Sequence, residues 1–133
     1  MANVTRVAGA SMDASTGMFA PQISGDLYAG EALNAVAPCR IHTDGKVYMS
    51  NGTANNASAG FDGFTPKAYT IGEPVTLFGV GARFRYGSGM TPDTDLYVSG
   101  TAGLLSDTAT TGGLVAIART VSSTDIRVIV NAA

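Results

Sequence analysis

Cys39 and His42 are the side chains in this sequence best suited to chemistry, because a thiol beside an imidazole can act as a nucleophile activated by a base. They are also the single Cys and the single His of the chain. Residues three apart in a strand point to opposite faces, so the imidazole cannot reach the sulfur if this segment is extended. We therefore expect a small buried cysteine and a surface histidine, and we predict no catalytic residues.

Metal and cofactor sites are not predicted either. A structural zinc site needs several Cys or His ligands, which this chain lacks. Asp93 and Asp95 could begin a calcium loop, but the remaining ligands of an EF-hand are missing. Gly79 and Gly81 begin like a dinucleotide fingerprint, yet Phe84 stands where its third glycine should be. Most acidic residues stand beside glycine or in turns, where Asp bonds the nearby backbone.

The elements that position these residues are predicted to be short strands, with the densest pattern in residues 72–99. Pro74 can open a strand, and an apolar run follows it at residues 75–80. Glycines at the end of this run predict a sharp bend, with the same strand curving on through residues 83–86. There, aromatic and arginine side chains alternate, which predicts one apolar face and one charged face. A further strand is expected at Leu96–Ser99.

Elsewhere, the clearest local pattern is a β-hairpin. Residues 39–42 and 46–50 are its predicted strands, and Asp44 and Gly45 are expected to form a type I′ turn between them. Pro38 limits any helix before it to one turn. Other strands are predicted at residues 23–28, 114–121 and 126–130. Many short strands with glycine-rich turns predict an all-β single domain, a small barrel or sandwich of short antiparallel strands.

The N-terminal residues fit neither a helix nor a core strand, because their apolar side chains follow no consistent period. We interpret residues 1–22 as an extended arm and residues 23–133 as the β domain; simple terminal disorder is the alternative. The arm is expected to be mobile in the free protein and to add as a strand to a sheet edge on a partner. The residues expected to make that contact are Val4, Arg6, Val7, Met18 and Phe19.

Composition limits the partners. Charged residues make up 14% of the chain, against roughly 25% in ordinary soluble proteins. Either part of the exterior is covered in an assembly, or Ser, Thr and Asn supply a polar surface. A net charge of −2 without a basic run argues against nucleic acid. We find no secretory pattern and no membrane-length apolar run, so we expect synthesis in the cytoplasm and no membrane partner.

Two short segments of the sequence are similar to each other. Tyr48–Ala54 is similar to Tyr97–Ala102, and the pair Gly30-Glu31 upstream of the first is similar to Gly72-Glu73 upstream of the second. Duplication of a β unit is one explanation, and repeated use of common hairpin chemistry is the other.

Several short segments of the sequence, in the order in which they occur, resemble segments of a known protein family. They are Gly72–Gly79, Arg85–Gly89, Asp95–Ser99, and a tail that combines Ile117–Arg119 with Thr124–Val128. Together they resemble the capsid decoration (head cement) proteins of tailed phages, over roughly residues 23–130. The resemblance implies a trimer on the outside of the phage head that clamps neighbouring major capsid subunits, with no catalytic residues.

The resulting expectation is a structural virion protein made in the host cytoplasm and located on the outer capsid surface. Its expected partners are the major capsid protein and two further copies of itself. The alternative is a carbohydrate- or receptor-binding β module of a phage fibre or adhesin; the absence of Trp disfavours it, because sugar sites favour aromatic platforms. A small hydrolase is a third class, for which the sequence holds no complete constellation.

Overall fold

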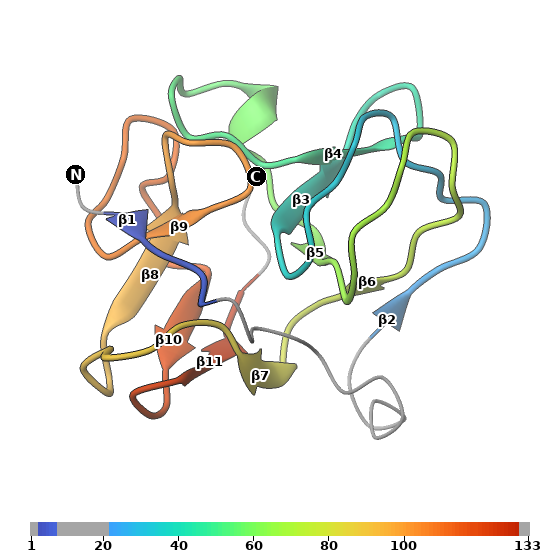
Figure 1. Cartoon of the computed structure of the whole chain (residues 1–133). Helices are drawn as coiled ribbons and strands as arrows, with labels where there is room; N and C mark the ends of the chain where they lie inside the picture. The colour runs from blue at the N-terminus through green and yellow to red at the C-terminus, as the bar shows by residue number, and fades with distance from the viewer. Residues whose placement is uncertain (1–2, 8–21, 131–133) are drawn as a thin grey trace.

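Two antiparallel sheets form the fold (Figure 1). The computed structural model describes residues 3–7 and 22–130. The six-stranded sheet has the order β1 (Asn3–Val4), β9 (Leu105–Ser106), β8 (Asp95–Val98), β10 (Ala118–Thr120), β11 (Asp125–Val128), β7 (Arg83–Arg85). The five-stranded sheet has the order β2 (Gln22–Ile23), β6 (Leu77–Phe78), β5 (Gly63–Phe64), β3 (Pro38–Ile41), β4 (Val47–Met49). The predicted all-β class is confirmed; the sheets do not close into a barrel, and a sandwich is compatible with them.

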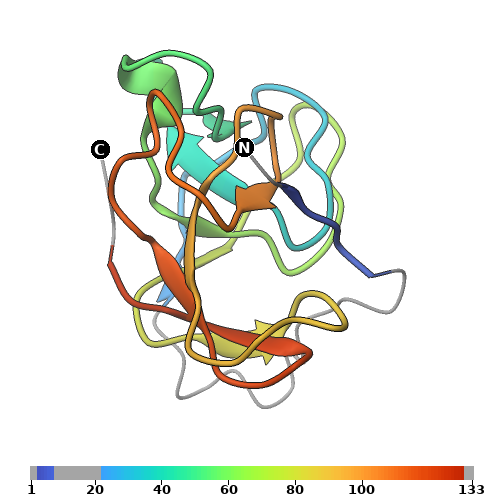
Figure 2. The same cartoon turned by 90° about the vertical axis from the view of Figure 1, so that its left-hand side faces the viewer.

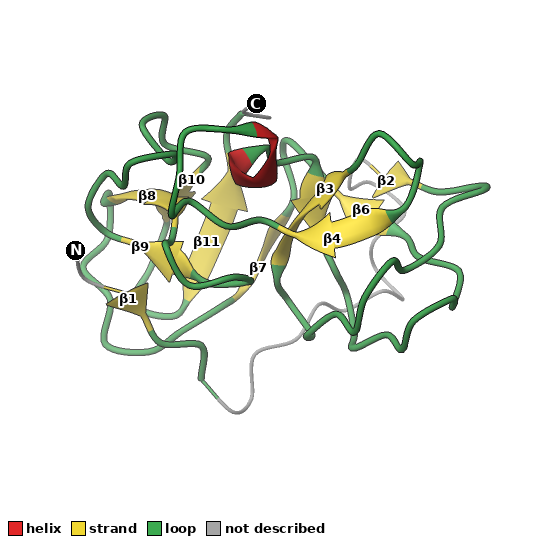
Figure 3. Cartoon of the chain, turned by 90° about the horizontal axis from the view of Figure 1, so that it is seen from above, coloured by secondary structure: helices red, strands yellow, loops and turns green. Residues whose placement is uncertain are grey.

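Each sheet fills one half of the molecule. Figure 2, turned so that the half with the six-stranded sheet faces the reader, shows β10 and β11 in front. From above, the two sheets lie next to each other (Figure 3). The one helical segment in the described ranges is a 3-10 turn, Ala57–Ala59, and no helix there is long and apolar enough to cross a membrane.

Aromatic side chains join the two sheets. Phe64 of β5 packs edge-on against Phe84 of β7, with ring centroids 5.0 Å apart, and also against Tyr86 at 6.5 Å. Phe84 is buried between exposed Arg83 and Arg85, which confirms the alternation predicted for this strand. The larger core cluster therefore spans both sheets. A smaller cluster lies within the five-stranded half and includes Leu33, Val47, Tyr69, Val75 and Leu77.

The bend predicted between residues 75–80 and 83–86 is instead a crossing between sheets. β6 pairs in the five-stranded sheet and β7 in the six-stranded sheet, so one curved strand is wrong. A turn at Val80 and Gly81 separates them, and Gly81 has a φ of 95°. Glycine fits here because an L side chain rarely adopts a positive φ. The local pattern showed a break in the strand but not that its two parts pair with different neighbours.

The predicted hairpin forms, with Arg40 opposite Tyr48 across β3 and β4. Its turn type differs from the prediction. A type I′ turn needs positive φ at both central residues, whereas only Gly45 (78°), and not Asp44, has one. The Gly45 N–H donates to the His42 carbonyl at 2.8 Å, closing a turn one residue earlier. The Asp44 side chain accepts from the Lys46 N–H at 2.9 Å, which supports the turn without a left-handed Asp.

Two other predicted strands are shorter than expected. β2 ends at Ile23, because Gly25 (89°) and Asp26 (56°) take positive φ and turn the chain away. The apolar run at residues 114–121 becomes a strand only at Ala118, and its first two residues are exposed. An apolar run predicts burial only when a neighbouring surface covers it, and within residues 3–7 and 22–130 none covers the start of this run.

Candidate functional site

The N-terminal residues predicted as an arm are in part a strand of the protein's own sheet. Asn3 pairs with Ser106 and Val4 with Leu105, so β1 is the outer strand next to β9. The expectation that residues 2–20 contribute no core strand is therefore wrong for β1. Two residues are too few to show a period in the sequence. The other predicted contact residues, Met18 and Phe19, lie outside the described residues.

Arg6 binds the N-terminal segment, residues 3–7, to the junction between the sheets by hydrogen bonds. Its Nη1 donates to the carbonyl oxygens of Ala35 at 2.6 Å and Val36 at 2.9 Å, with a longer contact to Gly103 at 3.4 Å. The Val36 turn is strained, since a buried β-branched residue has a φ of 52°. Thr65 also supports it, because the Val36 N–H donates to the Thr65 carbonyl at 2.8 Å. Arg6 thus binds carbonyls that a strained turn directs toward it.

Tyr86 connects the N-terminal segment with the opposite end of the six-stranded sheet. Its carbonyl accepts from the Val7 N–H at 3.2 Å, and its hydroxyl accepts from the Leu105 N–H, also at 3.2 Å. The ring is fully buried. Burial raises the pKa of Tyr86 to about 12; the Arg6 charge and the Leu105 hydrogen bond oppose part of this rise. Val4, Arg6 and Val7 therefore come together, but on this chain's own core.

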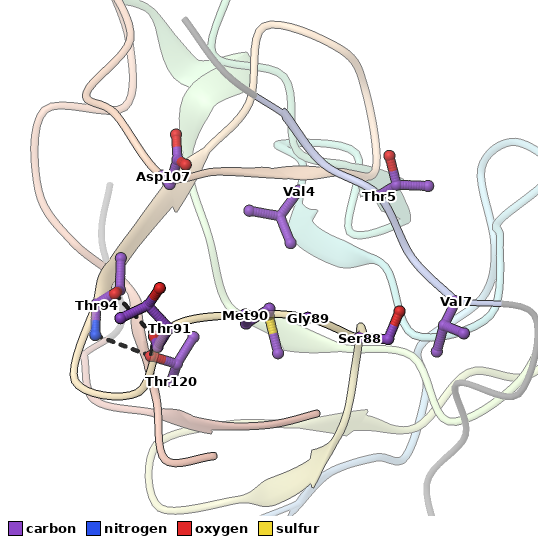
Figure 4. A pocket seen from close by; sticks show the side chains of 10 residues that line it. All are labelled: Val4, Thr5, Val7, Ser88, Gly89, Met90, Thr91, Thr94, Asp107 and Thr120. Carbon is purple, nitrogen blue, oxygen red and sulfur yellow. Dashed lines mark hydrogen bonds between the residues drawn. The ribbon is translucent and has the colours of Figure 1, made fainter. Parts of the chain in front are cut away.

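A groove of about 610 Å³ lies beside this segment (Figure 4). Val4, Thr5 and Val7 line one side, and the loop from Ser88 to Thr94, with Asp107 and Thr120, lines the rest. The Thr120 hydroxyl is engaged within the protein: its Oγ1 donates to the Thr91 carbonyl at 2.7 Å and accepts from the Thr94 N–H at 2.8 Å. None of the described lining residues is aromatic. The groove thus lacks the aromatic platform typical of sugar sites.

Cys39 and His42 do not form a nucleophile and base. Cys39 is fully buried, its Sγ lies 3.4 Å from the Ala37 carbonyl, and burial raises the pKa of its thiol far above the ordinary value. His42 packs instead against Arg40 and Tyr48, with its Nδ1 3.0 Å from Arg40 Nη1. Since Arg only donates, Nδ1 is the acceptor in this contact. A thiolate is strongly disfavoured at Cys39, because burial and the nearby Glu31 charge both raise the pKa of the thiol.

The carboxylates that could have begun a calcium loop are bound to arginine. Arg119 Nε lies 3.0 Å from Asp95 and 3.8 Å from Asp93. In the described part of the chain, no three His, Cys, Asp or Glu side chains gather as metal ligands would. Asp44 accepts from the Tyr48 hydroxyl at 2.7 Å, and this bond lowers the pKa of the Asp44 carboxyl. These acidic groups serve turns and ion pairs.

An apolar loop with an exposed start occupies residues 114–117, where the sequence predicted the start of a strand. Leu114 and Val115 precede β10 and leave 64% and 57% of their surfaces exposed. They border a hollow of about 160 Å³ whose wall includes Val98 and Ile117. Large aliphatic side chains adjacent to one another on a surface are typical of a site that another protein covers. The glycines that precede this run were the available sign of a loop.

Comparison with protein-family models and with curated proteins finds no match for this chain. The candidate functional features are therefore surfaces of the protein itself: the docked N-terminal segment, the apolar loop and the outer faces of the sheets.

Proposed function

We propose that this protein is a capsid decoration protein, a structural virion protein that binds the outside of the phage head as a trimer and stabilises contacts between major capsid subunits. One observation carries the proposal. The segments that resemble the decoration-protein family from Arg85 onward supply β8, β10 and β11 and the end of β7. They are dispersed over some forty residues of sequence. These four strands are neighbours in one sheet. The remaining segment, Gly72–Gly79, contains β6 of the other sheet. The part of the resemblance from Arg85 onward therefore falls on a single contiguous structural unit.

The mechanism in this proposal is mechanical. Three copies around a three-fold axis present three identical footprints, so modest contacts in each copy add up to strong binding through effective concentration. Preference for the expanded lattice stabilises that lattice by mass action. The apolar loop at Leu114 and Val115 is the described surface best suited to contact between copies, because water exposure of both side chains is unfavourable in a monomer.

The arm keeps a narrower role in this proposal. Val4, Arg6 and Val7 contact the protein's own sheet, so their use in head binding would require β1 to leave β9. The roles of Met18 and Phe19 in head binding stay a prediction. No observation in the described groove favours the carbohydrate-binding alternative, since aromatic side chains do not line it.

Co-sedimentation with empty, expanded phage heads, alongside native mass spectrometry, tests the proposal. Saturable binding in multiples of three per head site, with a trimer in solution or on the head, is the expected result. A Met18→Ser/Phe19→Ser variant tests the arm separately while leaving β1 in place. Absence of binding to heads, or a stable dimer both free and bound, would reject the proposed function.

A further inference from the structure

Arginine side chains gather on the outer face of the six-stranded sheet. The strand register aligns Asp95, Arg119, Arg127 and Arg83 in one row across the neighbouring strands β8, β10, β11 and β7. Arg85 follows Arg83 on the same face of β7. All four arginines are exposed, whereas the residues that alternate with them, such as Phe84 and Ile126, are buried. We call these four residues the arginine face.

Carboxylates of the same chain neutralise only part of this face. Arg83 pairs with Asp125 at 3.3 Å, and Arg119 pairs with Asp95 at 3.0 Å. Within the described residues, Arg127 has no ion pair although it lies at the centre of the row. Its direct neighbours across both strand interfaces are Arg119 and Arg83. Like charges directly opposite one another destabilise a sheet, so this arrangement costs the free protein stability.

Protection of a sheet edge does not account for the arrangement. Basic side chains on an edge strand prevent unwanted pairing, and β7 is an edge. β10 and β11, however, are interior strands and need no such protection. The arginine face comprises four of the chain's eight Lys and Arg residues, and three Asp pair with it, at positions 93, 95 and 125. The rest of the chain has four basic and seven acidic residues, so the face is the basic pole of an acidic protein.

We propose that the arginine face docks onto a carboxylate-bearing surface of a partner protein, with Arg127 receiving a partner Asp or Glu. This inference rests on the proposed function, in which that partner is the major capsid subunit. A carboxylate beside Arg127 gives it the kind of partner that Arg83 and Arg119 already have within the chain, and guanidinium and carboxylate match as a bidentate pair. A nucleic-acid backbone fits less well, because the three aspartates in the face repel closely spaced phosphates.

The test compares Arg127→Glu with a matched control, Lys46→Glu, which makes the same charge change in the exposed loop of the β3–β4 hairpin. Binding isotherms on empty, expanded heads are measured at about 50 and 200 mM salt. We expect Arg127→Glu to weaken binding roughly tenfold or more, because the lost pair recurs in three copies. The salt dependence should decrease, and Arg85, which also has no ion pair within the described residues, should retain part of it. Arg127→Gln should give an intermediate loss. Lys46→Glu should bind like the parent.

The same Arg127→Glu variant should melt higher than the parent, by roughly 2–5 °C, because two like-charge neighbours become opposite-charge neighbours. Higher stability with weaker binding is a result that misfolding cannot produce. If the parent binds heads but Arg127→Glu binds like Lys46→Glu, the inference is overturned and the proposed function stands. If the parent does not bind heads, the proposed function fails, and this inference with it. If Arg127 instead governs binding to a double-stranded DNA oligonucleotide, the assigned carboxylate chemistry is wrong.

Discussion

Replacement of Arg6 by Met tests whether the N-terminal segment belongs to the folded protein. The nitrogen Nη1 carries two hydrogens, so the 2.6 and 2.9 Å bonds to Ala35 and Val36 are well made, and the 3.4 Å contact to Gly103 shares one of them. A hydrogen bond from a charged group contributes about 1.5–3 kcal/mol, and two bonds from one nitrogen are not additive. We therefore expect a loss of about 2–4 kcal/mol, which lowers the melting temperature by about 6–16 °C for a chain of this length.

The assay is thermal and urea unfolding of Arg6→Met beside Lys46→Met, which removes one exposed cation and leaves the core intact. Lys46→Met should unfold within about 0.5 kcal/mol of the parent. Equal midpoints for the two variants would refute the reasoning, because they would mean that residues 3–7 do not hold the sheets together in solution. The whole N-terminal segment would then be available to a partner, as the sequence alone had indicated.

Three further predictions concern Gly81, Tyr86 and the apolar loop at Leu114 and Val115. Gly81→Val should cost about 1–3 kcal/mol, since valine strains at a φ of 95°, and an unchanged urea midpoint would contradict this. Tyr86 has a native pKa of about 12 against an ordinary value of 10.0, so the unfolded chain loses this proton first and stability should fall between pH 10 and 12, by up to about 3 kcal/mol. Tyr86→Phe should be less stable at pH 7 but lose less over that pH interval in urea titrations; equal slopes would reject the assignment. Leu114→Ser/Val115→Thr should leave the melting temperature unchanged and reduce the trimer fraction in native mass spectra, and an intact trimer would exclude this loop as the contact between copies.

Local patterns predicted much of the fold because several elements are determined by neighbouring residues. The alternation around Phe84 and the existence of the β3–β4 hairpin depend on side-chain period and on a short turn, both visible in sequence. The hairpin register was missed by one residue, because the predicted turn would place Arg40 opposite Met49, whereas Arg40 lies opposite Tyr48. The break near Gly81 was visible too. Its meaning was not, because a local signal cannot tell a bend from a passage between two sheets.

The candidate site was less predictable because its contacts are distant in the sequence. Arg6 binds carbonyls 29, 30 and 97 residues away, and no periodicity in a short segment points to them. Leu114 illustrates the opposite error, in which an apolar run was taken for a strand although no part of the chain that the structure describes covers its start. The arginines at alternate positions of β7 were recognised as one face of a strand. Their alignment with Arg119 and Arg127 depends on register across three strands.

The two similar segments, Tyr48–Ala54 and Tyr97–Ala102, lie against each other in the fold, and this contact bears on their origin. The Gly52 N–H donates to the Ser99 carbonyl at 2.7 Å, and the Gly103 N–H donates to the Ser50 carbonyl at 3.1 Å. Ser50 and Ser99 occupy equivalent positions in the two segments, and both are fully buried. In a two-fold contact, each partner presents the same group to the other, as these two carbonyls do. The two acceptors are equivalent, but the donors are not, because Gly52 corresponds to Gly100 and Gly103 follows the second segment. Repeated use of hairpin chemistry would not require the two segments to meet, so the matching acceptors favour duplication of a β unit whose strands later took different places: β4 at a sheet edge and β8 in a sheet interior.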